Sequence, residues 1–199
     1  MPRKTRTIRS GEYYHIVSRG NNHQWLFETE DDFKFYLRML ERYSQKYNVQ
    51  ILHYCLMNNH THLLLKSNVM DHGITKLMHD VQMIYAFYYQ RKYGKSGHVF
   101  EDRFKDFHIS SESYLLECGR YIERNPVRAM LAKKPEGYDW SSYRFYGYGR
   151  LNNLITENPL YSQFGGTSKE RQKAYRQYLT EARPYDVIVD AHIKERVLF

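Results

Sequence analysis

Two histidines at strand spacing are the residues of this sequence best suited to chemistry. His60 and His62 lie in the run from Met57 to Leu65, whose leucine-rich character predicts a buried strand. Residues i and i+2 of a strand project from the same face, about 6.6 Å apart, so these two imidazoles could share one divalent ion. An imidazole without a partner is costly inside an apolar sheet, so the pair needs either polar partners or a metal. The spacing alone leaves both possibilities open.

A tyrosine and an asparagine four residues apart could add a hydroxyl and an amide to such a site. The sequence predicts a helix that begins at Ser110 or Ser111 and is interrupted at Asn125-Pro126. On a continuing turn, Tyr121 and Asn125 would meet on one face, with β-carbons about 6 Å apart. Asn before Pro is also typical of the N-cap of a short following helix, a role that competes with metal binding. With twenty tyrosines in the chain, periodicity does not select Tyr121.

The elements that must position these residues follow the order β-α-β-β-α-β. The predicted strands are Tyr13–Val17, Val49–Met57 and His60–Lys66. One predicted helix starts at Thr29 and stops at Asn48, and a second runs through Leu77 and ends at Gly94. An extended segment is predicted over Gly97–Ile109. This order predicts an α+β fold with a ferredoxin-like split β-α-β antiparallel sheet. We expect two helices on one face, an open opposite face and a C-terminal helical extension with a polar helix over Lys169–Glu181.

Composition favours a nucleic-acid partner. Thirty Lys and Arg against 22 Asp and Glu give a net charge of +8, and twenty tyrosines accompany them in the 199 residues. Cations neutralise phosphates and aromatic rings stack on unpaired bases. Cys55 and Cys118 form no CxxC motif, and we expect neither a signal peptide nor a membrane span. The sequence therefore predicts one main cytoplasmic domain, nucleoid-associated when bound to DNA.

Four separated motifs carry a resemblance to a known family. They are Tyr14-His15-Ile16-Val17-Ser18-Arg19-Gly20-Asn21, Met57-Asn58-Asn59-His60-Thr61-His62-Leu63-Leu64, Tyr121-Ile122-Glu123-Arg124-Asn125-Pro126-Val127-Arg128-Ala129 and Trp140-Ser141-Ser142-Tyr143. In this order the chain, over roughly residues 10–145, resembles the REP-associated tyrosine transposases, which are single-tyrosine HUH transposases. It departs from the usual pattern at Asn58, where the family has Pro, and at Thr61, where the family has a hydrophobic residue.

The resemblance implies a metal-dependent single-stranded DNA endonuclease and strand transferase in DNA transposition. Tyr121 would be the nucleophile that forms a covalent 5′-phosphotyrosine intermediate. His60, His62 and Asn125, the last one helical turn after the tyrosine, would bind Mg²⁺ or Mn²⁺. The implied domain, HUH-type and RRM-like, occupies residues 1–146, and residues 147–199 form an extension of uncertain role.

The resemblance also implies the DNA partner, a hairpin of the repetitive extragenic palindrome type with a flanking single strand, bound by a monomer or homodimer. Candidate DNA-binding residues are those of a basic N-terminal arm, Arg3, Lys4, Arg6 and Arg9, and those near the motifs, Arg19, Arg103, Lys105, Arg124 and Arg128.

Two other classes of function remain open from the sequence. A non-catalytic single-stranded nucleic-acid-binding protein would use the same sheet and tyrosines for stacking, with His60 and His62 as polar core residues. A hydrolase could instead bind Zn²⁺ through the two histidines and either His53 or Cys55, although no Glu stands beside them as a general base.

Overall fold

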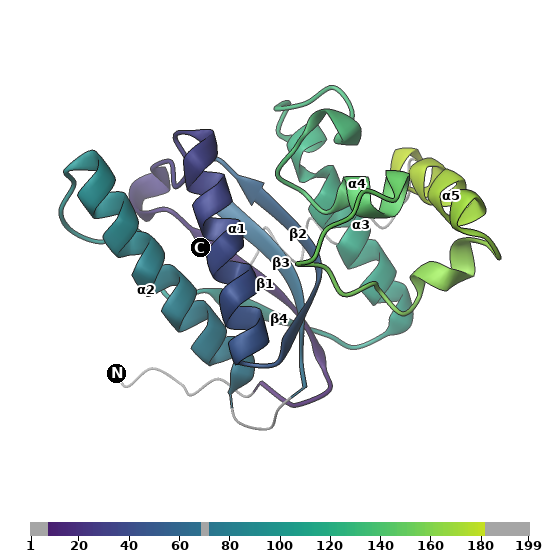
Figure 1. Ribbon diagram of the computed structural model, residues 1–199, viewed down its shortest axis with the longest axis horizontal. Coiled ribbons are helices and arrows are strands. Elements are labelled where there is room, and N and C mark those ends of the chain that lie inside the picture. The colour runs from purple at the N-terminus through teal and green to yellow at the C-terminus, as the bar shows by residue number, and fades with distance from the viewer. Residues whose placement is uncertain (1–7, 69–71, 182–199) are drawn as a thin grey trace.

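The computed structural model describes residues 8–68 and 72–181, and it has a four-stranded antiparallel sheet (Figure 1). The strands are β1 (Tyr13–Arg19), β2 (Val49–Met57), β3 (His60–Ser67) and β4 (Lys105–Ile109), in the order β2-β3-β1-β4. Helices α1 (Glu30–Lys46) and α2 (Gly73–Tyr93) connect them. The predicted β-α-β-β-α-β order and α+β fold are therefore confirmed.

Local sequence signals explain where α1 and α2 begin and end. Thr29 is the N-cap of α1 and forms a capping box with Asp32, whose carboxylate accepts the Thr29 backbone N–H at 2.9 Å. Asn48, the predicted stop, has a φ of 49° and lies just beyond the end of α1. Gly94 ends α2 in the left-handed region, at a φ of 61°, which glycine adopts without strain.

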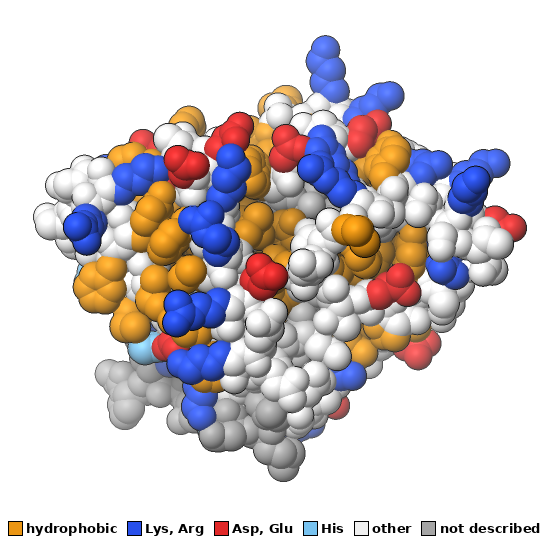
Figure 2. Space-filling view, in the orientation of Figure 1, with side chains coloured by type: hydrophobic (Ala, Val, Ile, Leu, Met, Phe, Trp, Pro, Cys, Tyr) orange, Lys and Arg blue, Asp and Glu red, His pale blue; other side chains and the backbone are white. Residues whose placement is uncertain are grey.

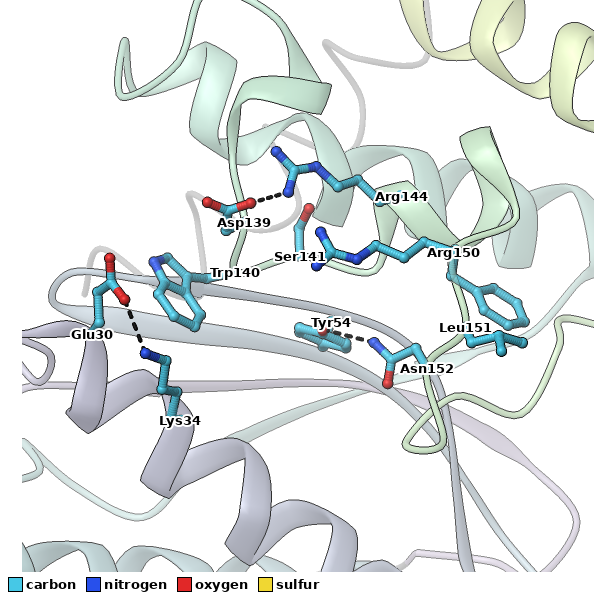
Figure 3. Close-up of a pocket in the computed structure, with 11 residues that line it drawn as sticks. Glu30, Lys34, Tyr54, Asp139, Trp140, Ser141, Arg144, Arg150, Leu151 and Asn152 are labelled. Carbon is cyan, nitrogen blue, oxygen red and sulfur yellow. Dashed lines mark hydrogen bonds and ion pairs between the residues drawn. The ribbon is translucent and has the colours of Figure 1, made fainter.

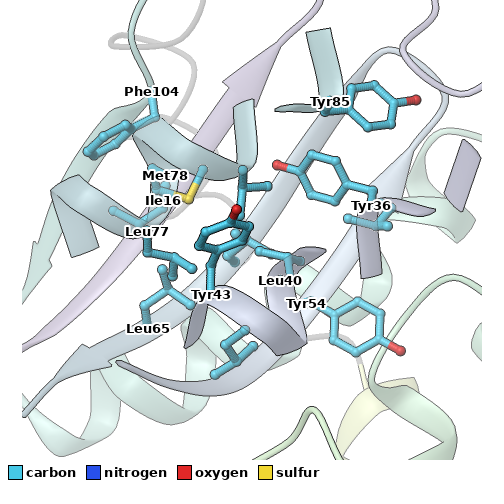
Figure 4. Packing of buried hydrophobic residues seen from close by; sticks show 14 of the residues in the cluster. Ile16, Tyr36, Leu40, Tyr43, Tyr54, Leu65, Leu77, Met78, Tyr85 and Phe104 are labelled. Atoms are coloured by element: carbon cyan, nitrogen blue, oxygen red, sulfur yellow. The ribbon is translucent and has the colours of Figure 1, made fainter. Parts of the chain in front are cut away.

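Helices α1 and α2 pack side by side on one face of the sheet and bury its main core (Figure 4). Tyr36 and Leu40 of α1, Leu77 and Met78 of α2 and Ile16 of β1 all lie in this cluster. The apolar residues that recur at helical spacing on α1 and α2 therefore pack against the alternate strand residues that point to this face of the sheet.

The opposite face, which the sequence predicted to be open, is partly covered by α3 (Glu112–Arg128), which packs against β2 and β3. Leu52 and Leu64 of the sheet lie in one buried cluster with Ile122 of α3. Close approach depends on Gly119, because a β-carbon there would lie 2.7 Å from Nε2 of His53. The binding surface expected on this face is therefore limited to what α3 leaves uncovered.

The predicted interruption of α3 at Asn125-Pro126 is wrong, because the helix runs through Pro126 to Arg128. Proline has no N–H to donate to the carbonyl of Ile122. The side-chain NH₂ of Asn125 donates to this carbonyl at 3.4 Å and to that of Tyr121 at 3.0 Å. Asn125 thus stabilises the continuing helix and is not the N-cap of a new one.

The segment predicted as extended over Gly97–Ile109 forms a strand only from Lys105 onward. Before it, the chain is a loop whose carbonyls at Gly97 and Val99 accept side-chain amides of Gln90 and Gln24. Its backbone also pairs briefly with the chain at the end of β1: the Val99 carbonyl accepts the Asn21 N–H at 2.9 Å, and the Glu101 N–H donates to the Arg19 carbonyl at 3.0 Å. This pairing amounts to an isolated bridge between Gly20 and Phe100 and does not extend into a strand.

Residues 129–181 pack onto α3 and β2 on the right of Figure 1. They form α4 (Tyr143–Tyr148), α5 (Ser168–Thr180) and the short helices η2 (Pro135–Gly137) and η3 (Tyr161–Phe164); a further short helix, η1 (Asn21–His23), follows β1. Helix α5 confirms the polar helix expected over this stretch. None of the helices within residues 8–68 and 72–181 is long and apolar enough to cross a membrane.

Candidate active site

Three histidines meet on the face of the sheet that α3 covers. His60 and His62 come from β3, and His15 comes from the neighbouring antiparallel strand β1. The Nε2 atom of His15 lies 2.9 Å from Nδ1 of His62, and the two rings meet edge to edge with centroids 5.1 Å apart. The predicted pair is therefore part of a larger imidazole cluster, held together by the pairing of β1 with β3.

Tyr121 lies on α3, which covers this face of the sheet, and contacts the histidine cluster. Its ring meets those of His62 and His15 edge-on, with centroids 5.7 and 6.0 Å apart. The guanidinium of Arg128 lies over the Tyr121 ring, 5.1 Å from its centroid, and Tyr121 is only 8% exposed. The helix therefore brings the predicted nucleophile and a cation to the predicted ligand histidines.

Burial keeps the three imidazoles neutral at physiological pH. It lowers the pKa of His15 to about 3, and it lowers the pKa of His60 to about 4 with a further contribution from the charge of Arg19. The pKa of His62 lies well below its usual value, mainly because the ring is buried and, to a smaller extent, because of the charges of His60, His15 and Arg128. Neutral imidazole is the form that binds metal ions.

The geometry of His60 and His62 fits a shared ion. Their rings are nearly perpendicular, at 87°, with centroids 4.9 Å apart. Two imidazoles that bind one ion, each through a nitrogen about 2.1 Å from it, have ring centres about 5 Å apart. The Nδ1 atom of His60 lies 2.7 Å from the amide oxygen of Asn59, which can only accept, so Nδ1 carries the proton and Nε2 keeps its lone pair.

Asn125 keeps the oxygen that its predicted ligand role requires. Both hydrogen bonds of its side chain use the NH₂ group, which leaves the amide oxygen to coordinate or accept. Within the described ranges, no group of three or more His, Cys, Asp or Glu side chains could hold a metal ion. A third protein ligand at this site would therefore be an amide or hydroxyl oxygen, the type of atom that the sequence prediction assigns to Asn125.

The zinc alternative finds little support in the surroundings of His53 and Cys55. The two ring nitrogens of His53 contact the Glu123 carboxylate at 2.9 Å and the Asn158 amide at 3.1 Å, so neither is left for a metal. Burial raises the pKa of the Cys55 thiol well above its usual value, which disfavours the thiolate that zinc requires.

Of the two unusual residues of the histidine motif, one lies on the opposite face of β3 from His60 and His62, and the other lies in the hairpin turn before them. Thr61 is fully buried, and its strand position directs it to the face opposite His60 and His62. The Asn58 carbonyl accepts the backbone N–H groups of Leu26 and Phe27 at 2.7 and 3.0 Å. A proline at position 58 would keep the same carbonyl acceptor.

The predicted DNA-binding residues fall into three groups. Arg19 and Arg128 lie beside the histidine cluster, as their effects on His60 and His62 indicate. Arg9, Arg103, Lys105 and Arg124 lie elsewhere: near Tyr14, in the loop before β4, at the start of β4 and next to the backbone of Glu181, respectively. Arg3, Lys4 and Arg6 fall outside the described residues. On the face shown in Figure 2, Lys and Arg side chains are spread over the surface, and several of them follow one another in a column down the left half of the view.

A pocket lies away from the histidine cluster, at the outer edge of β2 (Figure 3). It has a volume of about 410 Å³ and is lined by Lys34 of α1 and by Trp140, Arg144 and Arg150 of the later chain. Arg144 pairs with Asp139 inside it. No predicted catalytic or ligand residue reaches this pocket, so the candidate chemistry stays at the histidine cluster.

Sequence reasoning missed His15. Its position in the first motif marks it only as a strand residue, because its partner His62 lies 47 residues away. The available signal is alternation: His15 falls between the buried Tyr14 and Ile16 of the main core, so it must face the opposite side of the sheet.

Comparison with known families places this geometry in context. A family model described as Transposase IS200 like matches residues 9–125, more than half of the chain, and this range includes His15, His60, His62, Tyr121 and Asn125. No curated protein matches the sequence.

Three solved structures show the range of similarity. The REP-associated tyrosine transposase bound to a REP hairpin aligns with a TM-score of 0.61 at 14% identity, covering 79% of this chain and 93% of that one, which shows a shared fold. A transposase structure from Deinococcus radiodurans R1 gives 0.41 at 18% identity over 61% and 96% of the two chains. The tRNA(His) guanylyltransferase of Saccharomyces cerevisiae gives 0.45 at 11% identity over 90% and 82%. The last two alignments do not show a shared fold.

Proposed function

Because the chain belongs to the IS200-like transposase family, which acts in DNA transposition, we propose that it is a metal-dependent single-stranded DNA endonuclease and strand transferase. Its substrate would be a REP-type DNA hairpin with a flanking single strand. The contact of Tyr121 with His62, at 5.7 Å between ring centroids, is the observation that carries this proposal. This contact brings the predicted nucleophile on α3 close to the predicted ligand histidines on β3, from which it is distant in sequence.

The residues divide the chemistry between them. The phenol oxygen of Tyr121 attacks the scissile phosphorus, forms one O–P bond and displaces the 3′ oxygen of the preceding nucleotide. The phenol gives up its proton and the departing oxygen takes one up, which leaves a 5′-phosphotyrosine and a free 3′-hydroxyl. His60, His62 and Asn125 would hold Mg²⁺ or Mn²⁺, which supplies Lewis-acid polarisation of the phosphate.

Strand transfer needs no further energy source. The phosphotyrosine linkage retains the energy of the broken phosphodiester, so a second 3′-hydroxyl can displace Tyr121 and rejoin the DNA. Arg19 and Arg128, the two predicted DNA-binding cations beside the histidines, would neutralise phosphates on either side of the scissile bond. The solved fold relative is itself bound to a REP hairpin, which supports a hairpin as the substrate to test.

The decisive experiment looks for the covalent intermediate. Purified protein is mixed with labelled single-stranded hairpins from repeats flanking its own gene, with Mn²⁺ or Mg²⁺, and analysed on denaturing gels. We expect an adduct that disappears in Tyr121→Phe, in His60→Ala and in His62→Ala. Tyr114→Phe on the same helix is the matched control and should retain the adduct.

Hairpin binding separates this proposal from the non-catalytic alternative. Tyr121→Phe should bind the hairpin as tightly as the wild-type protein, because it loses one hydroxyl and no charge. Tight binding by the wild type with no adduct under either metal would favour a binding protein on a transposase scaffold. Cleavage retained in both histidine variants would contradict the ligand assignment.

A further inference from the structure

We propose that His15 is a positioning residue for His62: it accepts the Nδ1–H of His62 and thereby leaves the Nε2 lone pair of His62 for the metal ion. The inference rests on the proposed function, and it assigns a role to a third histidine that the metal chemistry does not itself require. His15 would touch the ligand and not the ion.

The contact is short and well supported by packing. Nε2 of His15 and Nδ1 of His62 lie 2.9 Å apart, and the planes of the two rings are inclined by 24°, as an edge-to-edge hydrogen bond allows. His15 is fully buried, with the rings of Phe107 and Tyr121 at centroid distances of 5.7 and 6.0 Å. These neighbours restrict rotation of the His15 ring, so its nitrogen is held in line with His62.

The hydrogen bond has two possible arrangements, and they differ in their consequence for metal binding. Two neutral imidazoles at this distance share one proton between the facing nitrogens. If His62 donates from Nδ1, its Nε2 is unprotonated and can coordinate. If His15 donates instead, His62 carries its proton on Nε2 and is blocked. Only the first arrangement agrees with His62 as a ligand.

The neighbouring ligand already has a partner of the same kind. His60 donates its Nδ1–H to the amide oxygen of Asn59 at 2.7 Å, which fixes its tautomer. Each ligand histidine thus has its Nδ1 engaged by a different residue, Asn59 for His60 and His15 for His62. Partners of this type orient ligand rings, and their loss lowers metal affinity by roughly 10- to 100-fold.

His15 also lends itself to a clean test. Its second nitrogen, Nδ1, is buried without a hydrogen-bond partner among the described residues, so the bond to His62 is the only one its ring makes there. His15→Leu removes that bond, whereas His15→Gln places an amide oxygen near the position of Nε2 and can still accept. His108→Leu is the matched control, because it makes the same substitution on β4, opposite Tyr14.

The experiment measures Mn²⁺ binding to the full chain without DNA, together with the ¹⁵N shifts of the His62 ring in the metal-free protein. We expect His15→Leu to weaken Mn²⁺ binding roughly 10- to 100-fold, His15→Gln to restore most of it, and His108→Leu to leave it unchanged. The ¹⁵N shifts should show His62 protonated on Nδ1 in the wild type and in a mixture of tautomers in His15→Leu.

The outcomes separate this inference from the proposed function. Wild-type affinity in His15→Leu, or a wild-type His62 protonated on Nε2, would overturn the role of His15 while leaving the metal site standing. Failure of the wild type itself to bind Mn²⁺, with His62 nonetheless protonated on Nδ1, would count against the metal site and keep the hydrogen-bond assignment. Thermal unfolding of each variant identifies any loss that comes from misfolding.

Discussion

The buried carboxylate of Glu123 on α3 accepts a hydrogen bond from the hydroxyl of Tyr175 on α5 at 2.7 Å. The same carboxylate accepts from Ser142, the N-cap of α4, and contacts His53 of β2 at 2.9 Å. The side chain of Glu123, two residues after Tyr121, thus connects α5, the start of α4 and β2 to α3. The segment after residue 142 therefore contributes to the orientation of the helix that carries the predicted nucleophile.

Tyr175→Phe tests this connection. The substitution keeps the ring and leaves the fully buried Glu123 with one donor fewer, so we expect a loss of about 1–3 kcal/mol in the free energy of unfolding. Urea denaturation measures it. Tyr148→Phe is the control, because that ring is 47% exposed and its loss of a hydroxyl should change stability little. Equal stability of the two variants would show that α5 does not hold Glu123.

Acid stability depends on Asp32 in the α1 capping box. Burial alone would raise the pKa of this carboxyl, but hydrogen bonds from Lys92, Tyr93 and the backbone of Thr29 and Glu28 outweigh it, and the pKa lies well below the usual range. A carboxyl whose pKa is lower in the folded state than in the unfolded state stabilises the fold at pH values above its unfolded pKa of about 4. This stability is lost as the pH falls toward the folded value.

Asp32→Asn should therefore lower stability at pH 7 by about 1–3 kcal/mol and flatten the decline in stability below about pH 4. Unfolding midpoints from pH 7 to about pH 2.5 measure both effects. Asp31→Asn makes the same substitution one residue earlier at an exposed position and should keep the wild-type slope. An unchanged slope in Asp32→Asn would mean that other carboxyls control acid unfolding.

Gly119→Ala should be destabilising although alanine is the better helix former. Its β-carbon would lie 2.7 Å from Nε2 of the buried His53, so α3 must move away from β2, at a cost of about 1–3 kcal/mol. Because Tyr121 follows two residues later, adduct formation should fall as well. Gly137→Ala, with its nearest contact at 3.8 Å and no left-handed φ, should behave as the wild type. A stable, fully active Gly119→Ala protein would show that α3 has room to adjust.

The fold and half of the site could be predicted because their signals are local. The two-residue hairpin turn, each helix cap and the i, i+2 spacing of His60 and His62 are each encoded within a few consecutive residues. His15 could not be assigned in this way, since its partner depends on the pairing of β1 with β3. The course of α3 through Pro126 was missed for a different reason. A local rule predicts a helix end there, and the side chain of Asn125 overrides it.

Arg128 offers a test of charge beside the nucleophile. Its guanidinium lies over the Tyr121 ring at 5.1 Å, where it can neutralise the phosphate as the tyrosine attacks. We expect Arg128→Ala to slow adduct formation about tenfold, which corresponds to about 1.4 kcal/mol of barrier, with a smaller effect on hairpin binding. Arg103→Ala, an exposed residue in the loop before β4, should weaken binding at most and leave the rate at saturating DNA unchanged. Equal effects of the two substitutions on binding and rate would indicate that Arg128 contributes only to general DNA binding. A rate effect confined to Arg128 would place its charge at the reacting phosphate.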